Sequence, residues 1–253
     1  MPALRRRIGI VGYGSGGQAC ALALLQAGHE VEVFERVPKP GPVGAGFLLQ
    51  PTGLQALWRL GLLQAVHALG TPVARLHGET RDRRAVMDMR YAALDPLLTG
   101  LGLQRGALFE LLHAAIGGRE RLHADTTILE LDCDGGRLRD AGGRWHGPFD
   151  AIVIADGSAS ALRAAVSPTR LDRPYPWGAL WCLVPEGDWP WRDELRQRYA
   201  LARRMTGMLP VGRAPGDPVR KLGFFWSLPV ARFDAWEREG PEAWLRELEA
   251  LWP

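Results

Sequence analysis

The sequence is poor in cysteine and in long apolar runs, and each shortage excludes a class of protein. Only three cysteines occur among 253 residues, and they lie far apart without a CxxC pair. Neither a disulfide framework nor a zinc site is therefore predicted. No apolar run approaches the roughly eighteen residues of a membrane span, and glycines interrupt the stretch after Arg7, which argues against a secretory signal. We expect a cytoplasmic protein with no membrane partner.

Lysine is also scarce, since Lys39 and Lys221 are the only two and arginine carries almost all the positive charge. The 31 basic and 28 acidic residues give a formal net charge of +3, which is too small an imbalance to indicate a nucleic-acid partner. The 31 glycines and 19 prolines follow no period, so a fibrous or low-complexity chain is excluded. The length allows one large domain or two smaller ones.

The composition changes near Ser167–Pro168, because eight of the ten tryptophans come after residue 170. The earlier part is rich in Gly, Ala and Leu and alternates between strand and helix patterns, which is typical of βαβ units and a mainly parallel sheet. Strands are predicted over Arg7–Val11, Glu30–Glu35, Thr127–Cys133 and Asp150–Ala155. Helices are predicted over Gly16–Ala27, over Leu54–Leu69 with breaks at Gly61 and Gly70, and over Gly106–Ile116.

A second region has a different pattern. Residues 75–91 alternate like paired antiparallel strands, further strands are predicted over Gly178–Val184 and Lys221–Leu228, and an amphipathic helix begins at Pro241. The predicted fold class is α/β, with a Rossmann-like nucleotide-binding domain (residues 1–74 and 99–167) and a mostly antiparallel β-sheet substrate domain (residues 75–98 and 168–253).

The strongest local signal is a glycine-rich turn, Gly12-x-Gly14-x-x-Gly17, between the first strand and the first helix. These glycines allow a tight turn, close approach of a pyrophosphate and close packing of the helix on the strand. Glu35 ends the second strand, 23 positions after Gly12, where a carboxylate can accept hydrogen bonds from ribose hydroxyls. An adenine dinucleotide is predicted, and this pattern alone does not separate NAD from FAD.

Three further segments resemble those of the FAD-dependent aromatic-ring hydroxylases, the single-component flavoprotein monooxygenases similar to para-hydroxybenzoate hydroxylase. They are residues 44–54 (GAGFLLQPTGL), residues 104–108 (QRGAL) and residues 150–163 (DAIVIADGSASALR), in the order of that family. The last segment matches the family's Asp-Gly motif. The resemblance covers residues 8 to about 165.

The resemblance implies a role for each matching position. Glu35 would hold the adenosine ribose with Arg36 beside the adenine, Arg105 would meet the pyrophosphate, and Asp156 would lie near FAD and be tied to NAD(P)H use. Ser160 and Arg163 would serve as scaffold. The implied cofactor-binding residues are Gly12, Gly14, Ser15, Gly17, Glu35, Arg36, Gly46, Arg105 and Asp156.

One motif of the family is missing. Its late Gly-Asp segment has no match, since neither Gly187-Asp188 nor Gly216-Asp217 has the expected continuation. The substrate domain is therefore expected to be incomplete, with the rest supplied by another chain or lost by truncation. A complementing C-terminal fragment or a homo-oligomer is an expected partner, and the isolated chain is expected to be poorly soluble or associated.

The resemblance implies a FAD-dependent monooxygenase that uses NAD(P)H and oxygen to hydroxylate an aromatic or similar apolar substrate. Leu222, Phe224 and Trp226 share one strand face and, with Trp181, would line the substrate pocket, unless they are ordinary core. No catalytic side chain or metal site is indicated, and the six histidines are expected on the surface or in loops. Two alternatives remain: a non-catalytic or truncated FAD-binding subunit, and an NAD-dependent dehydrogenase. A tryptophan-type halogenase is disfavoured because its Trp-x-Trp-x-Ile-Pro signature is absent.

Overall fold

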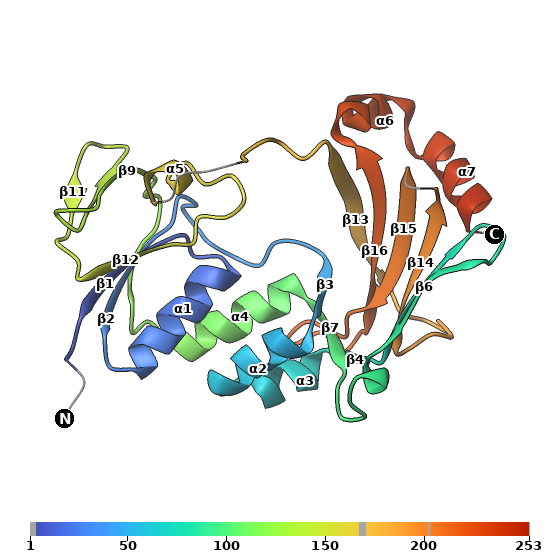
Figure 1. Cartoon of the computed structure of the whole chain (residues 1–253), viewed down its shortest axis with the longest axis horizontal. Helices are drawn as coiled ribbons and strands as arrows, with labels where there is room; N and C mark the ends of the chain where they lie inside the picture. The colour runs from blue at the N-terminus through green and yellow to red at the C-terminus, as the bar shows by residue number, and fades with distance from the viewer. Residues whose placement is uncertain (1–3, 167–170, 202, 253) are drawn as a thin grey trace. The chain divides into compact units, whose positions relative to one another are not determined.

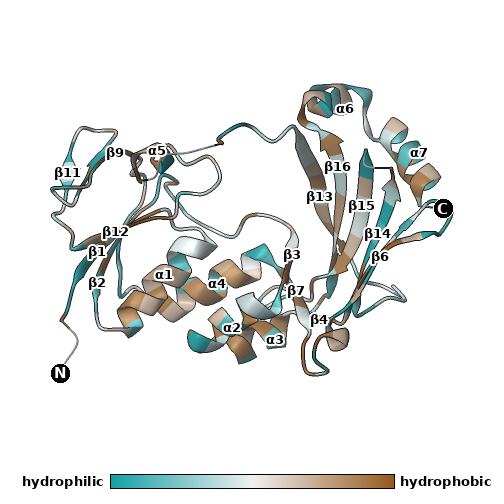
Figure 2. Ribbon diagram, viewed as in Figure 1, coloured by the Kyte–Doolittle hydropathy of each residue, from teal (hydrophilic) through white to brown (hydrophobic). Residues whose placement is uncertain are grey.

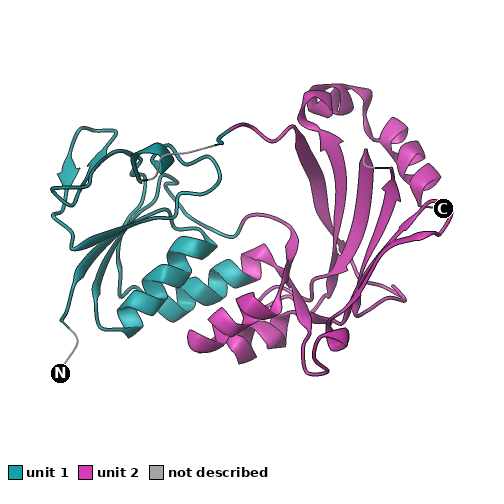
Figure 3. Cartoon of the chain, viewed as in Figure 1, with its two compact units in different colours: residues 1–42, 108–172 teal, residues 43–107, 173–253 magenta. Residues whose placement is uncertain are grey.

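The computed structural model describes residues 4–166, 171–201 and 203–252 (Figure 1). Contacts divide the chain into two compact units, residues 1–42 with 108–172 and residues 43–107 with 173–253 (Figure 3). These units differ from the predicted domains in residues 43–74, 99–107 and 168–172, so the division into nucleotide and substrate domains stays a prediction. The predicted boundary at Ser167–Pro168 lies outside the described residues.

The first unit is built on a parallel four-stranded sheet in the order β12-β1-β2-β8. Its strands are β1 (Arg7–Val11), β2 (Glu30–Phe34), β8 (Arg121–His123) and β12 (Ala151–Ile154). Both central strands are almost wholly buried, as expected for a parallel sheet covered on both faces; β1 is apolar after Arg7, whereas β2 alternates glutamates with apolar residues. This confirms the predicted mainly parallel sheet.

Both faces of this parallel sheet are covered within the first unit. Helix α1 (Ser15–Gln26) packs on β1 and β2, and α4 (Arg105–Ile116) lies beside α1 (Figure 1). A small antiparallel sheet of β9 (Ile128–Asp132), β10 (Arg137–Asp140) and β11 (Trp145–His146) contributes to a separate core with Phe34 and Phe149. The short helix α5 (Arg163–Val166) follows the last parallel strand.

The second unit contains a six-stranded sheet in the order β13-β16-β15-β14-β5-β6. All its pairings are antiparallel except that of β5 with β14, which confirms a mostly antiparallel second sheet. Its strands are β5 (Arg75–Thr80), β6 (Ala85–Arg90), β13 (Trp177–Pro185), β14 (Glu194–Ala200), β15 (Arg204–Pro210) and β16 (Lys221–Pro229). Figure 2 shows β14 as largely hydrophilic, in contrast to the apolar residues of β16.

Two C-terminal helices cover part of this six-stranded sheet. Side chains of α6 (Phe233–Glu239) and α7 (Pro241–Leu251) pack with Phe224 and Trp226 of β16 in one apolar core. A smaller sheet, β3-β7-β4, and two helices complete the unit. These elements are β3 (Gly46–Leu49), α2 (Pro51–Arg59), α3 (Leu63–Leu69), β4 (Thr71–Val73) and β7 (Gly100–Gln104), with short 3-10 turns at Tyr91–Ala93 and Val230–Arg232.

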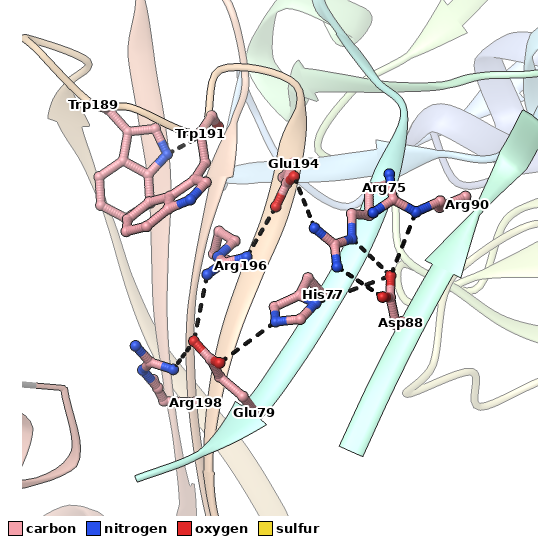
Figure 4. A network of polar contacts seen from close by, with 10 residues as sticks. All are labelled: Arg75, His77, Glu79, Asp88, Arg90, Trp189, Trp191, Glu194, Arg196 and Arg198. Atoms are coloured by element: carbon pink, nitrogen blue, oxygen red, sulfur yellow. Dashed lines mark hydrogen bonds and ion pairs between the residues drawn. The ribbon is translucent and has the colours of Figure 1, made fainter. Parts of the chain in front are cut away.

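A buried charge network explains why β14 can be polar inside a sheet (Figure 4). Glu79 of β5 pairs with Arg198 and with Arg196 of β14, and its second oxygen lies 3.5 Å from His77 Nε2. Arg196 also lies under the Trp191 ring, 4.5 Å from its centroid. Burial alone would raise the pKa of Glu79, but the hydrogen bond and charge of Arg198 lower it below its ordinary value. Each buried charge therefore has a partner, as burial requires.

The predicted break at Gly61 is confirmed. The stretch from residue 54 to residue 69 forms two helices, because Gly61 adopts φ +77° and its N–H bonds to the Trp58 carbonyl, which ends α2. One expectation needs correction. The histidines are not all surface or loop groups: His77 and His146 are only 9% and 8% exposed. A hydrogen-bonded carboxylate offsets the free-energy cost of burying a histidine ring, as Asp140 does at 2.7 Å from His146 Nε2.

Candidate functional site

The glycine-rich turn is held by contacts that exclude larger residues. Gly12 has φ +100°, and a Cβ there would lie 2.9 Å from the Cα of Asp156. A Cβ on Gly17 would overlap the carbonyl oxygen of Gly12. These two glycines let the turn close on itself and against the end of β12, which is the packing that the sequence pattern predicts.

The helix after this turn presents an open N-terminus. Gly14 is its N-cap and supplies no side-chain hydrogen bond to the first turn. No atom lies within 4 Å of where a Gly14 Cβ would stand, and Ser15 is exposed. Uncapped backbone N–H groups at a helix N-terminus are suited to an anion such as a pyrophosphate. The turn therefore fits the phosphate part of a dinucleotide.

Glu35 is fixed at the end of β2 by the backbone. Its Oε2 accepts the Tyr13 N–H at 2.7 Å, and its Oε1 accepts the Val37 N–H at 2.9 Å. Each carboxylate oxygen has a further lone pair with which it can accept another hydrogen bond. The carboxylate is thereby held beside the glycine-rich turn and is able to accept hydroxyl donors such as those of a ribose.

Four of the residues predicted to bind the cofactor line one cavity of about 100 Å³: Gly12, Glu35, Arg36 and Asp156. They come together because Glu35 and Asp156 follow the carboxyl ends of β2 and β12, which flank β1 in the sheet. Small-molecule pockets usually measure roughly 300–1,000 Å³. This cavity therefore suits one part of a dinucleotide, such as its ribose, rather than the whole molecule.

Two other predicted residues, Gly46 and Arg105, line a cavity of about 220 Å³ in the second unit. They meet because β3 pairs with β7, which places Gly46 opposite Gln104, and because the Arg105 N–H donates to the Ala45 carbonyl at 2.8 Å. Aromatic side chains of the six-stranded sheet form much of the remaining wall. That wall comprises Ala45, Ala179, Trp181, Leu209, Gly223, Phe224 and Phe225.

Only part of the aromatic set expected to line the substrate pocket lies at this cavity. Trp181 and Phe224 line the cavity beside Arg105, whereas Leu222 and Trp226 do not. Trp226 is 3% exposed and packs in the core with Leu251 of α7. Neighbouring strand residues point to opposite faces, so Phe225 and Gly223 join the cavity wall from the other face of β16.

Of the two expected scaffold residues of the Asp-Gly segment, Arg163 braces the loop after β12. Arg163 donates to the Ser158 carbonyl at 2.5 Å and forms an ion pair with Asp172 at 2.8 Å. The Ser160 hydroxyl is buried and has no hydrogen-bond partner among the described residues. Arg163 thus holds the segment that carries Asp156, in agreement with its expected structural role.

Sequence reasoning missed Tyr13, the variable residue between Gly12 and Gly14. Its ring is 1% exposed, and its hydroxyl lies 2.9 Å from both His113 Nδ1 and Glu120 Oε1. Burial, then the hydrogen bond to Glu120, raises the pKa of Tyr13 above its ordinary value. A large polar aromatic residue inside a glycine-rich turn was the available signal. Tyr13 anchors the turn to α4 and to the segment that follows it.

Among the described residues, no helix is long and apolar enough to cross a membrane, and no group of three His, Cys, Asp or Glu side chains is arranged to hold a metal ion. The three cysteines are free.

No protein-family model matches the chain, but known proteins do. It is 26% identical over 261 residues to the FAD-dependent urate hydroxylase of Klebsiella pneumoniae, covering 96% of this chain and 63% of that one. It is 30% identical to the aurachin C monooxygenase/isomerase of Stigmatella aurantiaca, covering 80% and 53% of the two chains. The chain thus spans between half and two thirds of these relatives.

Solved structures share the fold. The tetrameric form of 2-methyl-3-hydroxypyridine-5-carboxylic acid oxygenase superposes with a TM-score of 0.75 at 22% identity, over 90% of this chain and 60% of that one. A Klebsiella pneumoniae HpxO variant complexed with FAD gives 0.71 at 23% identity, over 89% and 58%. The fold is that of the FAD-dependent monooxygenases. Together with the matching sequences, it confirms the resemblance: the chain is a relative of the FAD-dependent aromatic hydroxylases.

Proposed function

We propose that this chain binds FAD and forms part of an NAD(P)H-dependent flavin monooxygenase that hydroxylates an aromatic or similar apolar organic substrate. The observation that carries the proposal is the grouping of Gly12, Glu35, Arg36 and Asp156 around one cavity at the carboxyl ends of β1, β2 and β12. Ligands of open α/β sheets bind at this edge. The FAD-dependent relatives favour FAD over NAD as the dinucleotide.

Each predicted residue has a binding role in this proposal. The N–H groups that follow Gly14, from Ser15 to Gly17, would hold the pyrophosphate. Glu35 would accept the ribose hydroxyls, with Arg36 beside the adenine. Arg105, a planar guanidinium with paired donors, would bind the pyrophosphate.

FAD would supply the electron transfer from NAD(P)H to oxygen that hydroxylation requires. The chain's own residues would bind and orient the reactants and exclude water. Trp181, Phe225 and Leu209 give the cavity beside Arg105 and Gly46 an aromatic and apolar wall. Such a wall favours a planar apolar substrate, and it supplies no nucleophile.

The partners proposed are a small aromatic or apolar substrate and oxygen, without nucleic acid or membrane. A homo-oligomer is part of the proposal, since one structural relative is described as a tetramer. A cytoplasmic location is proposed because three free cysteines suit a reducing compartment.

The experiment is a test of turnover. Purified protein is mixed with FAD and with NADH or NADPH, and coenzyme oxidation is followed with urate, 3-amino-4-hydroxybenzoate and related aromatics. Substrate-stimulated oxidation with a hydroxylated product supports the proposal. FAD binding without coenzyme consumption would favour the binding-only alternative, and NAD reduction without flavin would favour a dehydrogenase.

A further inference from the structure

The proposed function leaves unused a cavity of about 340 Å³ within the second unit. It lies between the ends of β15 and β16 and the helices α6 and α7, and it shares no lining residue with the cavity beside Arg105. Its volume falls within the range of small-molecule pockets, roughly 300–1,000 Å³. The cavity can therefore hold a ligand of one or two fused rings.

Tryptophan forms the apolar part of the wall, through Trp177, Trp226, Trp236 and Trp244. Packing fixes these rings: Trp244 stands edge-on to Trp226, with centroids 6.3 Å apart and planes at 88°. A rigid aromatic wall binds a planar apolar body with little loss of side-chain entropy. The aromatic lining thus favours a flat ring system as ligand.

Arginine forms the polar part. Arg203, Arg204 and Arg232 line the cavity with two carboxylates, Glu239 and Glu247, so the lining carries three positive and two negative charges. Arg204 pairs with Glu247 at 3.3 Å. Arg203 and Arg232 have no carboxylate within 4.0 Å in the part of the chain that the structure describes. Two guanidinium groups therefore remain able to bind an anion.

Two tryptophans of the lining also carry buried hydrogen-bond donors. The indole N–H groups of Trp236 and Trp244 are buried and have no acceptor among the described residues. Buried donors are normally paired, and an unpaired one is destabilising. Ser227, also in the lining, already exchanges hydrogen bonds with the Met205 backbone at 2.8 and 3.0 Å. The indole nitrogens have almost no accessible surface, so an acceptor on a ligand would reach them only after a small shift of the rings.

We propose that this cavity is a second small-molecule site, which binds a planar aromatic carboxylate with its ring between the tryptophans and its charge on Arg203 and Arg232. The site is independent of the flavin and of the cavity beside Arg105. Through this site the second unit would bind an aromatic acid that need not be the substrate.

The test is calorimetric titration of the FAD-free 253-residue chain with 1-naphthoate and with its neutral analogue 1-naphthamide. We expect the naphthoate to bind and the amide to bind at least tenfold more weakly. In an Arg203→Gln/Arg232→Gln variant, naphthoate affinity should fall at least tenfold. Arg246→Gln, an exposed arginine of α7 outside the lining, and Arg105→Gln should leave it unchanged.

Equal affinity for the acid and the amide, or no binding of the acid by the wild-type chain, would overturn the proposal. So would unchanged affinity in the double variant, or loss of affinity in Arg105→Gln, which would move the ligand to the other cavity. The comparison of acid with amide uses the wild-type chain alone and does not depend on any variant folding. None of these outcomes depends on whether the protein hydroxylates a substrate.

Discussion

Glu35 accepts the backbone N–H of Tyr13 at 2.7 Å, and this bond ties the end of β2 to the middle of the glycine-rich turn. The two parts of the proposed dinucleotide site, the carboxylate for the ribose and the amides for the pyrophosphate, are thereby fixed relative to each other. A second backbone N–H, from Val37, holds the other oxygen. The carboxylate is thus placed before any ligand arrives.

Replacing Glu35 by Ala should weaken FAD binding by ten- to a hundredfold. Hydrogen bonds to a charged group are worth about 1.5–3 kcal/mol, and the variant also releases the Tyr13 amide. Flavin fluorescence titration measures the change. Glu30→Ala is the matched control, because Glu30 is an exposed residue of the same strand, and among the described residues its carboxylate pairs with exposed Arg5 at 2.9 Å. Equal affinities in the two variants would remove Glu35 from the site.

Gly17→Ala should destabilise the fold, whereas Gly16→Ala should not. A Cβ at Gly17 overlaps the Gly12 carbonyl oxygen, while no atom lies within 4 Å of one at Gly16. Overpacking of this kind costs about 1–3 kcal/mol, and Ala in place of an exposed helical Gly gains up to about 1 kcal/mol. Urea unfolding of both variants checks this contrast. Similar stabilities would show that the turn is not packed as described.

Tyr13→Phe should lower the free energy of unfolding by about 1–3 kcal/mol, because it leaves the buried oxygen of Glu120 and the nitrogen of His113 without their shared partner. Tyr175→Phe is the control, since Tyr175 is 77% exposed and its change should stay within about 0.5 kcal/mol. Thermal unfolding of the Tyr13→Phe and Tyr175→Phe variants at neutral pH measures the two changes in stability. An unaltered melting temperature in Tyr13→Phe would show that the hydroxyl does not anchor the turn.

The network of Figure 4 should make the second unit acid-sensitive. Arg198 holds the pKa of Glu79 below its ordinary value of 4.5 in the folded chain despite burial. The unfolded chain therefore takes up this proton at a higher pH than the folded chain does. The stability that Glu79 contributes is complete above that ordinary value and is lost as the pH falls through the lower folded pKa.

Glu79→Gln should remove that part of the acid sensitivity. At neutral pH it should cost about 3–5 kcal/mol, because Arg198 would be left buried without its carboxylate. Glu130→Gln breaks only an exposed pair with Arg139 and should cost less than about 1 kcal/mol. Urea unfolding from about pH 3 to about pH 7 covers the range in which carboxylates titrate. It gives the slope of the unfolding free energy against pH for each variant and for the wild type. If the unfolding free energy of the Glu79 variant had the wild-type slope against pH, the pairing of Glu79 with Arg198 would be contradicted.

Periodicity predicted the long helices and several strands, but it missed β7, β14, β15 and the very short strands. The mainly apolar strands β1 and β16 and the alternating strand β2 were predicted because burial selects apolar residues. Strand β14 was missed because its sequence, ELRQRYA, is charged, and the pairing that allows those charges to be buried comes from Glu79, more than a hundred positions earlier. The short strands β4 and β8 are too brief for a period to show.

The candidate site also has parts that could be predicted from the sequence and parts that could not. The meeting of Gly12, Glu35 and Asp156 was predictable, because the carboxyl ends of parallel strands share one edge of the sheet. The prediction that Gly46 and Arg105 would both lie near the cofactor came only from the family resemblance; the structure puts them in one cavity through the β3–β7 pairing. The contacts of Tyr13 with His113 and Glu120 join residues about a hundred positions apart, and no local pattern encodes them.

The most direct test of the account is the affinity of the purified chain for FAD itself, measured by quenching of flavin fluorescence, with any complementing C-terminal fragment restored in a parallel titration. The account predicts saturable binding of one FAD per chain. A folded chain that shows no affinity for FAD in either titration would contradict it.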